Sequence, residues 1–204
     1  MAFTRAMVIL KGGTGVPKDQ FVNVFHFADV GVAYETASAA VATALTSMYT
    51  GLAAYFSEFV KPTAEIRTYD MTQGEPRVPS IFPLPLAIDT SATSLPNEVA
   101  ICLSFRGTPP VTPRRRGRVF LGPLNGNVYS GGLPSDANPP RPSVGCMNDI
   151  RTAGANLLAA DIGWSIWSPT DQQYVTVVGG WCDNEFDNML SRGNKPSARS
   201  SFGA

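Results

Sequence analysis

Three sets of residues have types and spacing that could support chemistry. They are a group of three acidic residues, a cluster of arginines and one histidine. Asp183, Glu185 and Asp187 alternate toward the C-terminal end of the chain. Alternating carboxylates can bind a hard cation or act as the acid and base of a small hydrolase. The segment lacks the glycine and the closing glutamate of an EF-hand loop, and a hard-cation site needs several converging oxygens. Because Arg192 and Arg199 follow closely, we expect ion pairs within or between subunits rather than a metal site.

The arginine cluster places four arginines within five residues, at 114–118. Guanidinium groups bind phosphates and carboxylates in bidentate geometry. The chain holds 16 basic and 16 acidic residues, so neither a broad nucleic-acid groove nor sequence-specific nucleic-acid binding is expected. The cluster is either a solvated hairpin tip or a contact with residues 183–187 of another subunit. The second hypothesis gives the interface candidates Arg114, Arg115, Arg116, Arg118, Asp183, Glu185, Asp187, Arg192 and Arg199.

The remaining candidate groups have no catalytic pattern. His26 is the only histidine, and no G-x-S-x-G nucleophile elbow exists for it to serve. The turn at 11–15 has its lysine before the glycines and precedes a strand, unlike a phosphate-binding loop. Cys102, Cys146 and Cys182 show no zinc-ligand spacing and are too few for a disulfide framework. We therefore expect a protein that is not an enzyme and has no metal and no cofactor.

The N-terminal third predicts two strands followed by a long helix. Residues 4–10 and 21–27 are strand-like. The second strand alternates, with Phe21, Asn23, Phe25 and Phe27 on one face and Val22, Val24 and His26 on the other. An apolar stripe with steps of three and four residues predicts a helix from Asp29, as its N-cap, to about Val60. Gly51 is the weak point of this helix.

The rest of the chain completes an α+β pattern. Residues 74–97 are rich in proline, which favours an extended segment with a short edge strand at 81–86. The polar and basic segment 192–204 is expected to be an extended arm after a single domain at 1–191. Further strands are predicted at 64–71, 97–105, 117–124, 164–167 and 174–181, and a weaker helix at 144–162. The predicted fold is a mostly antiparallel sheet with one long and one shorter helix packed on it.

Four strings together resemble a group of uncharacterised proteins from bacteriophage and environmental viral sequences. They are FVNVFHF at 21–27, PNEVAICLSF at 96–105, RRGRVFLGPL at 115–124, and WCDNEFD at 181–187 with Arg192 and Gly193. The resemblance spans most of the chain. It implies a viral origin and a virion component, and it brings no catalytic residues with it.

The sequence as a whole therefore predicts a virion structural protein of a bacteriophage. We expect a homo-oligomeric subunit of the tail or neck, of the terminator or completion type, located in the virion and assembled in the host cytoplasm. Its partners would be copies of itself and other virion proteins, with no membrane. A charged content of only 16%, against a usual ~25%, suits a surface partly covered by neighbours. The alternatives are a capsid or decoration protein, a small metal-dependent hydrolase using 183–187, and a nucleic-acid-binding module working through 114–118.

Overall fold

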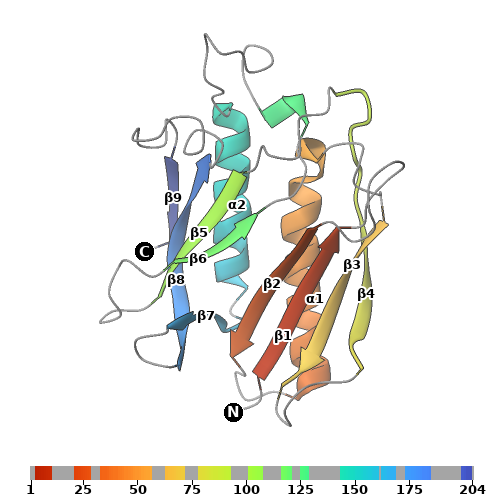
Figure 1. Cartoon of the computed structure of the whole chain (residues 1–204), viewed down its shortest axis with the longest axis vertical. Helices are drawn as coiled ribbons and strands as arrows, with labels where there is room; N and C mark the ends of the chain where they lie inside the picture. Colours follow the sequence, from red (N-terminus) through yellow and green to blue (C-terminus); the bar gives the residue numbers. More distant parts are fainter. Residues whose placement is uncertain are drawn as a thin grey trace.

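The computed structural model describes residues 3–10, 21–28, 33–56, 63–71, 78–92, 101–107, 116–120, 125–128, 143–160, 162–168, 173–184 and 199–203. Within these ranges, two helices lie on one face of an antiparallel sheet, which confirms the predicted α+β class (Figure 1). The strands are β1 (Phe3–Leu10), β2 (Phe21–Ala28), β3 (Thr63–Asp70), β4 (Ser80–Pro85), β5 (Ile101–Gly107), β6 (Arg116–Phe120), β7 (Trp164–Ser168), β8 (Gln173–Asn184) and β9 (Arg199–Gly203). The helices are α1 (Tyr34–Gly51) and α2 (Val144–Ala159), with short 3-10 turns η1 (Ala53–Tyr55) and η2 (Gly126–Val128).

The strand order reveals two units of the same topology. In the first unit, the hairpin β1-β2 is followed by α1 and then by β3 and β4, and the strands lie in the order β4-β3-β1-β2. In the second unit, the hairpin β5-β6 is followed by α2 and then by β8 and β9, in the order β9-β8-β5-β6. Strand β7 is an addition to the second unit. The fold is therefore a doubled strand-strand-helix-strand-strand arrangement.

The two units run in opposite directions and are joined at both ends. Strand β7, which follows α2, pairs with the end of β2, which precedes α1. At the other end, η1 follows α1 and lies against η2, which precedes α2. The start of each helix therefore lies near the end of the other, and α1 and α2 pack side by side in opposite directions (Figure 1). An approximate two-fold axis relates the units.

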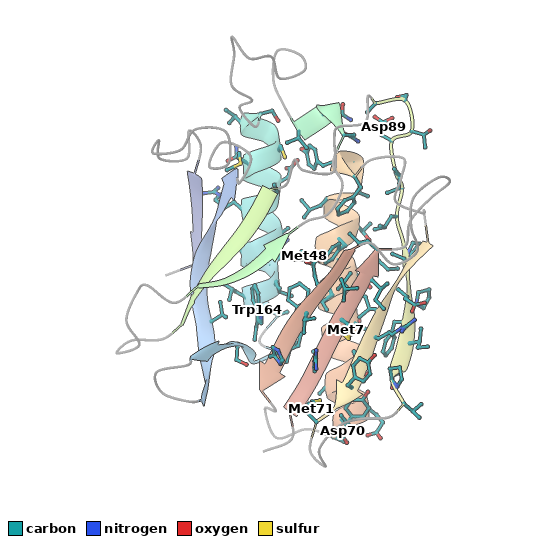
Figure 2. All side chains as sticks on the ribbon, viewed as in Figure 1. Met7, Met48, Asp70, Met71, Asp89 and Trp164 are labelled. Atoms are coloured by element: carbon teal, nitrogen blue, oxygen red, sulfur yellow. The ribbon has the colours of Figure 1, made fainter. Side chains whose placement is uncertain are left out.

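The core lies between the helices and the sheet, and its residues come from alternating strand positions. In β2, Asn23, Phe25 and Phe27 are buried, whereas Val22 and Val24 are exposed, as the sequence pattern predicted. The side chains of α1 that face the sheet include Val41, Leu45 and Met48. Figure 2 shows Met48 and Trp164 directed into the layer between helices and sheet. Burial of these apolar side chains is the main stabilising contribution to the fold.

Polar contacts fix α1 in register on the sheet. The Nδ2 atom of Asn23 donates a hydrogen bond of 2.7 Å to the hydroxyl of Tyr49, and both side chains are buried. Ser38 Oγ and Thr68 Oγ1 lie 2.5 Å apart in a second buried contact. The hydroxyl of Tyr34 donates to the carbonyl oxygen of Thr68 at 3.0 Å. Buried polar groups are costly unless paired, so these three bonds allow only one placement of α1 on the sheet.

The predicted first helix is too long at both ends. At its start, Ala33 is extended and forms the N-cap, so the helix does not begin next to Asp29. The helix spans Tyr34–Gly51 rather than reaching about Val60, and the chain continues as η1. The carbonyl oxygens that a longer helix would use are bound elsewhere. The backbone N–H of Asn125 donates to the carbonyl oxygen of Tyr55 at 2.9 Å, and its Nδ2 donates to the carbonyl oxygens of Ala54 and Phe56 at 2.8 and 2.9 Å. The proposed N-cap Asp29 lies outside the described residues, and the second helix ends at Ala159, close to the prediction.

Asn125 is the junction residue of the two units at this end of the molecule. It is fully buried, and its Oδ1 accepts the backbone N–H of Asn127 at 2.9 Å. Val128, at the end of η2, receives the backbone N–H of Ser143 on its carbonyl, and Ser143 caps α2 by accepting the N–H of Cys146. One asparagine therefore connects the turn after α1 to the segment that starts α2.

Both segments predicted to be extended contribute strands. Within 74–97, β4 forms the predicted edge strand and pairs with β3. Residues 199–203 of the predicted arm form β9, which pairs with β8 of the same chain and completes the second unit. This part of the C-terminal segment therefore belongs to the sheet of its own chain.

We predict that Asn125→Asp destabilises the protein by at least about 2 kcal/mol, because the isosteric carboxylate cannot donate to the Ala54 and Phe56 carbonyls and is itself buried. The free energy of unfolding from urea denaturation measures the effect. Asn127→Asp is the matched control, since Asn127 is exposed and should cost less than about 1 kcal/mol. Equal stability losses for the two variants would contradict the role of Asn125.

Candidate functional site

The most distinctive surface is the face of the sheet that the helices leave uncovered, which we call the open face. In the first unit, the strand residues that alternate with the helix-facing positions lie on it, and two of them, Ile9 and Glu65, are themselves buried. These strand residues are Arg5, Met7 and Ile9 in β1, Val22, Val24 and His26 in β2, Glu65, Arg67 and Tyr69 in β3, and Ile81, Pro83 and Pro85 in β4. Both helices lie behind the sheet in Figure 1, so this face is turned toward the viewer.

Arg5 and His26 form a row across the first unit. In the strand register, Arg5 pairs with His26 on one side and with Tyr69 on the other. The row continues from His26 to Ser165, whose hydroxyl donates to the carbonyl oxygen of His26 at 3.2 Å. The Nε atom of Arg5 is buried and makes no hydrogen bond with the described residues. An anion near this guanidinium would offset the cost of that burial.

His26 is held in its neutral form at neutral pH. Burial of the imidazole and, secondarily, the neighbouring Arg5 guanidinium lower the pKa of His26 to about 4. A second cation on the same face, Arg67, forms an ion pair with Glu65 two residues before it on β3. At neutral pH, Arg5 is therefore the cation of its row, and Arg67 has an acidic neighbour.

The register of the second unit places further arginines on the open face. Val177 is buried in the core and pairs with Gly107, so the helix-covered face includes the odd-numbered positions of β5. The even-numbered positions fall on the open face, together with their partners. Arg106 pairs with Arg116, and Ser104 pairs with Arg118. Three arginines from neighbouring strands thus occupy one face of this unit.

Two of the proposed interface residues are brought together within one chain. Asp183 on β8 pairs directly with Arg199 on β9, at an open-face position. Opposite charges on directly paired positions of an antiparallel sheet stabilise the pairing by up to about 1 kcal/mol. The register therefore makes Arg199 the strand neighbour of Asp183 within one chain. Arg116 and Arg118 lie on β6, and the other candidates, Arg114, Arg115, Glu185, Asp187 and Arg192, lie outside the described residues.

The described residues hold no group of three or more histidine, cysteine, aspartate or glutamate side chains placed to bind a metal ion. Two carboxylates of the first unit, for example, lie far apart. Asp70 is at the lower end of β3, and Asp89 is near the top of the molecule (Figure 2). In the same part of the chain, no helix has the length and hydropathy to cross a membrane. Comparison of the chain with protein-family models, with curated proteins and with solved structures finds no match.

Sequence reasoning missed two features of this surface. Arg5 and Arg106 were not singled out, because each is an isolated arginine in a strand. The sequence signal that could have identified them is the alternation of a polar residue with apolar residues along a strand. The structure shows that such isolated residues, rather than the 114–118 cluster alone, make up the basic character of the open face.

We predict that the imidazole of His26 titrates with a pKa near 4, followed through its Hε1 signal in proton NMR. His26 is the only histidine, so the assignment is unambiguous. The unfolded chain binds this proton near pH 6.5, so the contribution of neutral His26 to stability is full above that pH and is lost as the pH falls toward 4. Arg5→Gln should raise the pKa while leaving it below 6.5, since burial is the larger cause.

Arg151→Gln, on the exposed side of α2, is the matched control and should leave the titration unchanged. A wild-type pKa near 6.5 would contradict the burial of the imidazole, and an Arg5→Gln variant with the wild-type pKa would contradict the influence of Arg5.

Proposed function

We propose that this chain is a virion structural protein of a bacteriophage and acts as a self-assembling subunit, in the tail or neck as a terminator or completion protein. A capsid or decoration protein is the variant within the same class. The proposal rests on the sequence resemblance to phage proteins and on one structural observation. Apolar side chains are exposed along the edge strand β4 and just before it, where Ile81 is 59% and Val78 is 83% exposed.

The β4 edge is suited to contact through side chains rather than through strand addition. An unpaired edge strand usually offers its N–H groups to another chain. Pro83 and Pro85 have no N–H, so the donors that pair β4 with β3 must come from the residues between them. The prolines therefore stand at the free edge and remove its donors. A neighbouring subunit would cover Val78, Ile81 and the two proline rings.

The low charge of the chain supports the same proposal. A subunit whose edge is covered by its neighbour needs fewer charged residues for solubility than a monomer does. The apolar residues on β4 are contributed by one continuous segment, so a ring or a closed assembly could bury the same segment in every copy. The edge strand, rather than the helices, is then the surface through which copies meet.

We predict that the wild-type chain forms a closed homo-oligomer, measured as molar mass by light scattering after size exclusion and viewed by negative-stain electron microscopy. Ile81→Glu should shift the mass toward the monomer, because a carboxylate would be buried in the contact. Val144→Glu is the matched control, since Val144 is 78% exposed at the start of α2, away from β4. A wild-type chain that stays monomeric at its highest soluble concentration, or equal effects of the two variants, would contradict the proposal.

A further inference from the structure

In the part of the chain that the structure describes, the charged positions are segregated between the two sides of the molecule. Of the seven arginines in the described residues, six occupy open-face positions, whereas only two of the six carboxylates do. The six are Arg5, Arg67, Arg106, Arg116, Arg118 and Arg199, and the two carboxylates are Glu65 and Asp183. Among the described residues, the sheet face therefore holds more arginine than carboxylate positions, although the whole chain has a net charge of zero.

Most of the described carboxylates lie on the opposite side of the molecule or at the ends and edges of the sheet. The four described carboxylates away from the open face are Glu35 on α1, Asp149 on α2, Asp70 and Asp89, and Arg151 is the single described arginine there. Asp149 accepts a hydrogen bond of 2.5 Å from the hydroxyl of Tyr55. The described arginines therefore lie mainly on the sheet side and the described carboxylates mainly on the other side, which favours the approach of an anionic ligand to the open face.

We infer that the open face binds the phosphate backbone of single-stranded nucleic acid without sequence specificity. The inference goes beyond the proposed assembly role and does not depend on it. Its basis is charge complementarity over a broad surface. The arginines are distributed over β1, β3, β5, β6 and β9, so they match an extended anion rather than a small one. Guanidinium groups bind phosphate oxygens in bidentate geometry, and the described residues contain no lysine.

Aromatic positions on the same face favour nucleic acid over an acidic protein segment. Tyr69 pairs with Arg5 in the register, and Trp181 pairs with Ser104 next to the position of Arg118. Phe120 and His26 also occupy open-face positions. Bases of single strands stack on aromatic side chains while arginines bind the backbone, and sheet faces are common platforms for this arrangement. An acidic peptide would use the arginines and gain nothing from the rings.

Binding is tested by fluorescence anisotropy with a fluorescein-labelled oligothymidylate over a series of salt concentrations. Each phosphate neutralised on a single strand contributes a slope of about −0.7 to the logarithm of affinity against the logarithm of salt. With four phosphates contacted, affinity should fall roughly fiftyfold between about 50 and 200 mM salt. The Hε1 signal of His26 should shift when the oligonucleotide is added. Absence of binding at low salt overturns the inference.

The variants Arg106→Gln and Arg118→Gln distinguish binding by the open face from a general effect of the protein's net charge. Each should reduce the magnitude of the salt slope by about 0.7, whereas Arg151→Gln, the same charge change on α2, should leave it unchanged. Circular dichroism of each variant checks the fold, and Arg5→Gln provides a further open-face variant from the first unit. Equal weakening by Arg151→Gln would overturn the inference.

Two further measurements separate the competing explanations. Polyglutamate of matched length serves as an acidic-protein probe, and binding as tight as that of the oligonucleotide would assign the face to an acidic partner instead. The molar mass of the Arg106→Gln and Arg118→Gln variants should equal that of wild type, because a lowered mass would place these arginines in a subunit contact. A Val78→Glu variant changes the β4 edge outside the strand positions of the open face. It should weaken assembly and still bind the oligonucleotide, so a failure of assembly and a failure of binding are distinguishable.

Discussion

Hydrogen bonds from one buried asparagine determine how the two units of this protein are joined. Asn125 binds the carbonyl oxygens of Ala54, Tyr55 and Phe56, which ends the continuation of α1 and turns the chain toward β3. The same residue leads through η2 to Ser143, where α2 begins. Because backbone carbonyls in a core must be satisfied, this junction and the β7 crossing at the other end hold the helices antiparallel.

The antiparallel arrangement of the helices has a consequence for the surface. Both helices lie on the same side of the sheet, so the other face of both units is free of helices. In each unit, the register assigns apolar residues to the helix side and arginines to the other side. The register bulge between Arg106 and Gly107 matters here, because a slip of one residue in β5 would exchange the two faces.

Local patterns in the sequence predicted the elements well and the tertiary events poorly. The alternation at 21–27 identified the buried and exposed faces of β2 because one face of that strand packs against α1. The predicted end of α1 was wrong because Asn125, which binds the carbonyl oxygens after the helix, lies about 70 positions away in a segment without periodicity. Asn125 was overlooked for the same reason, since a buried asparagine with several partners resembles an ordinary loop residue in the sequence. The repetition of the two units could not be predicted from the sequence, because the units share a topology and no sequence motif.

Net charge was the least informative of the sequence properties, and the reason is physical. Phosphate binding depends on the local field, which falls off within about 10 Å at ordinary salt, so the sum over a whole chain does not measure it. In this protein, alternate strand positions sort arginines to one side, while the carboxylates Glu35 and Asp149 lie on the helices. The apolar residues of β4 lie at one edge of the sheet, and the arginine positions of β5 and β6 lie at the other edge. A subunit of this kind can meet its copies through the edge and still present the face to an anion, so assembly and binding need not compete for the same residues.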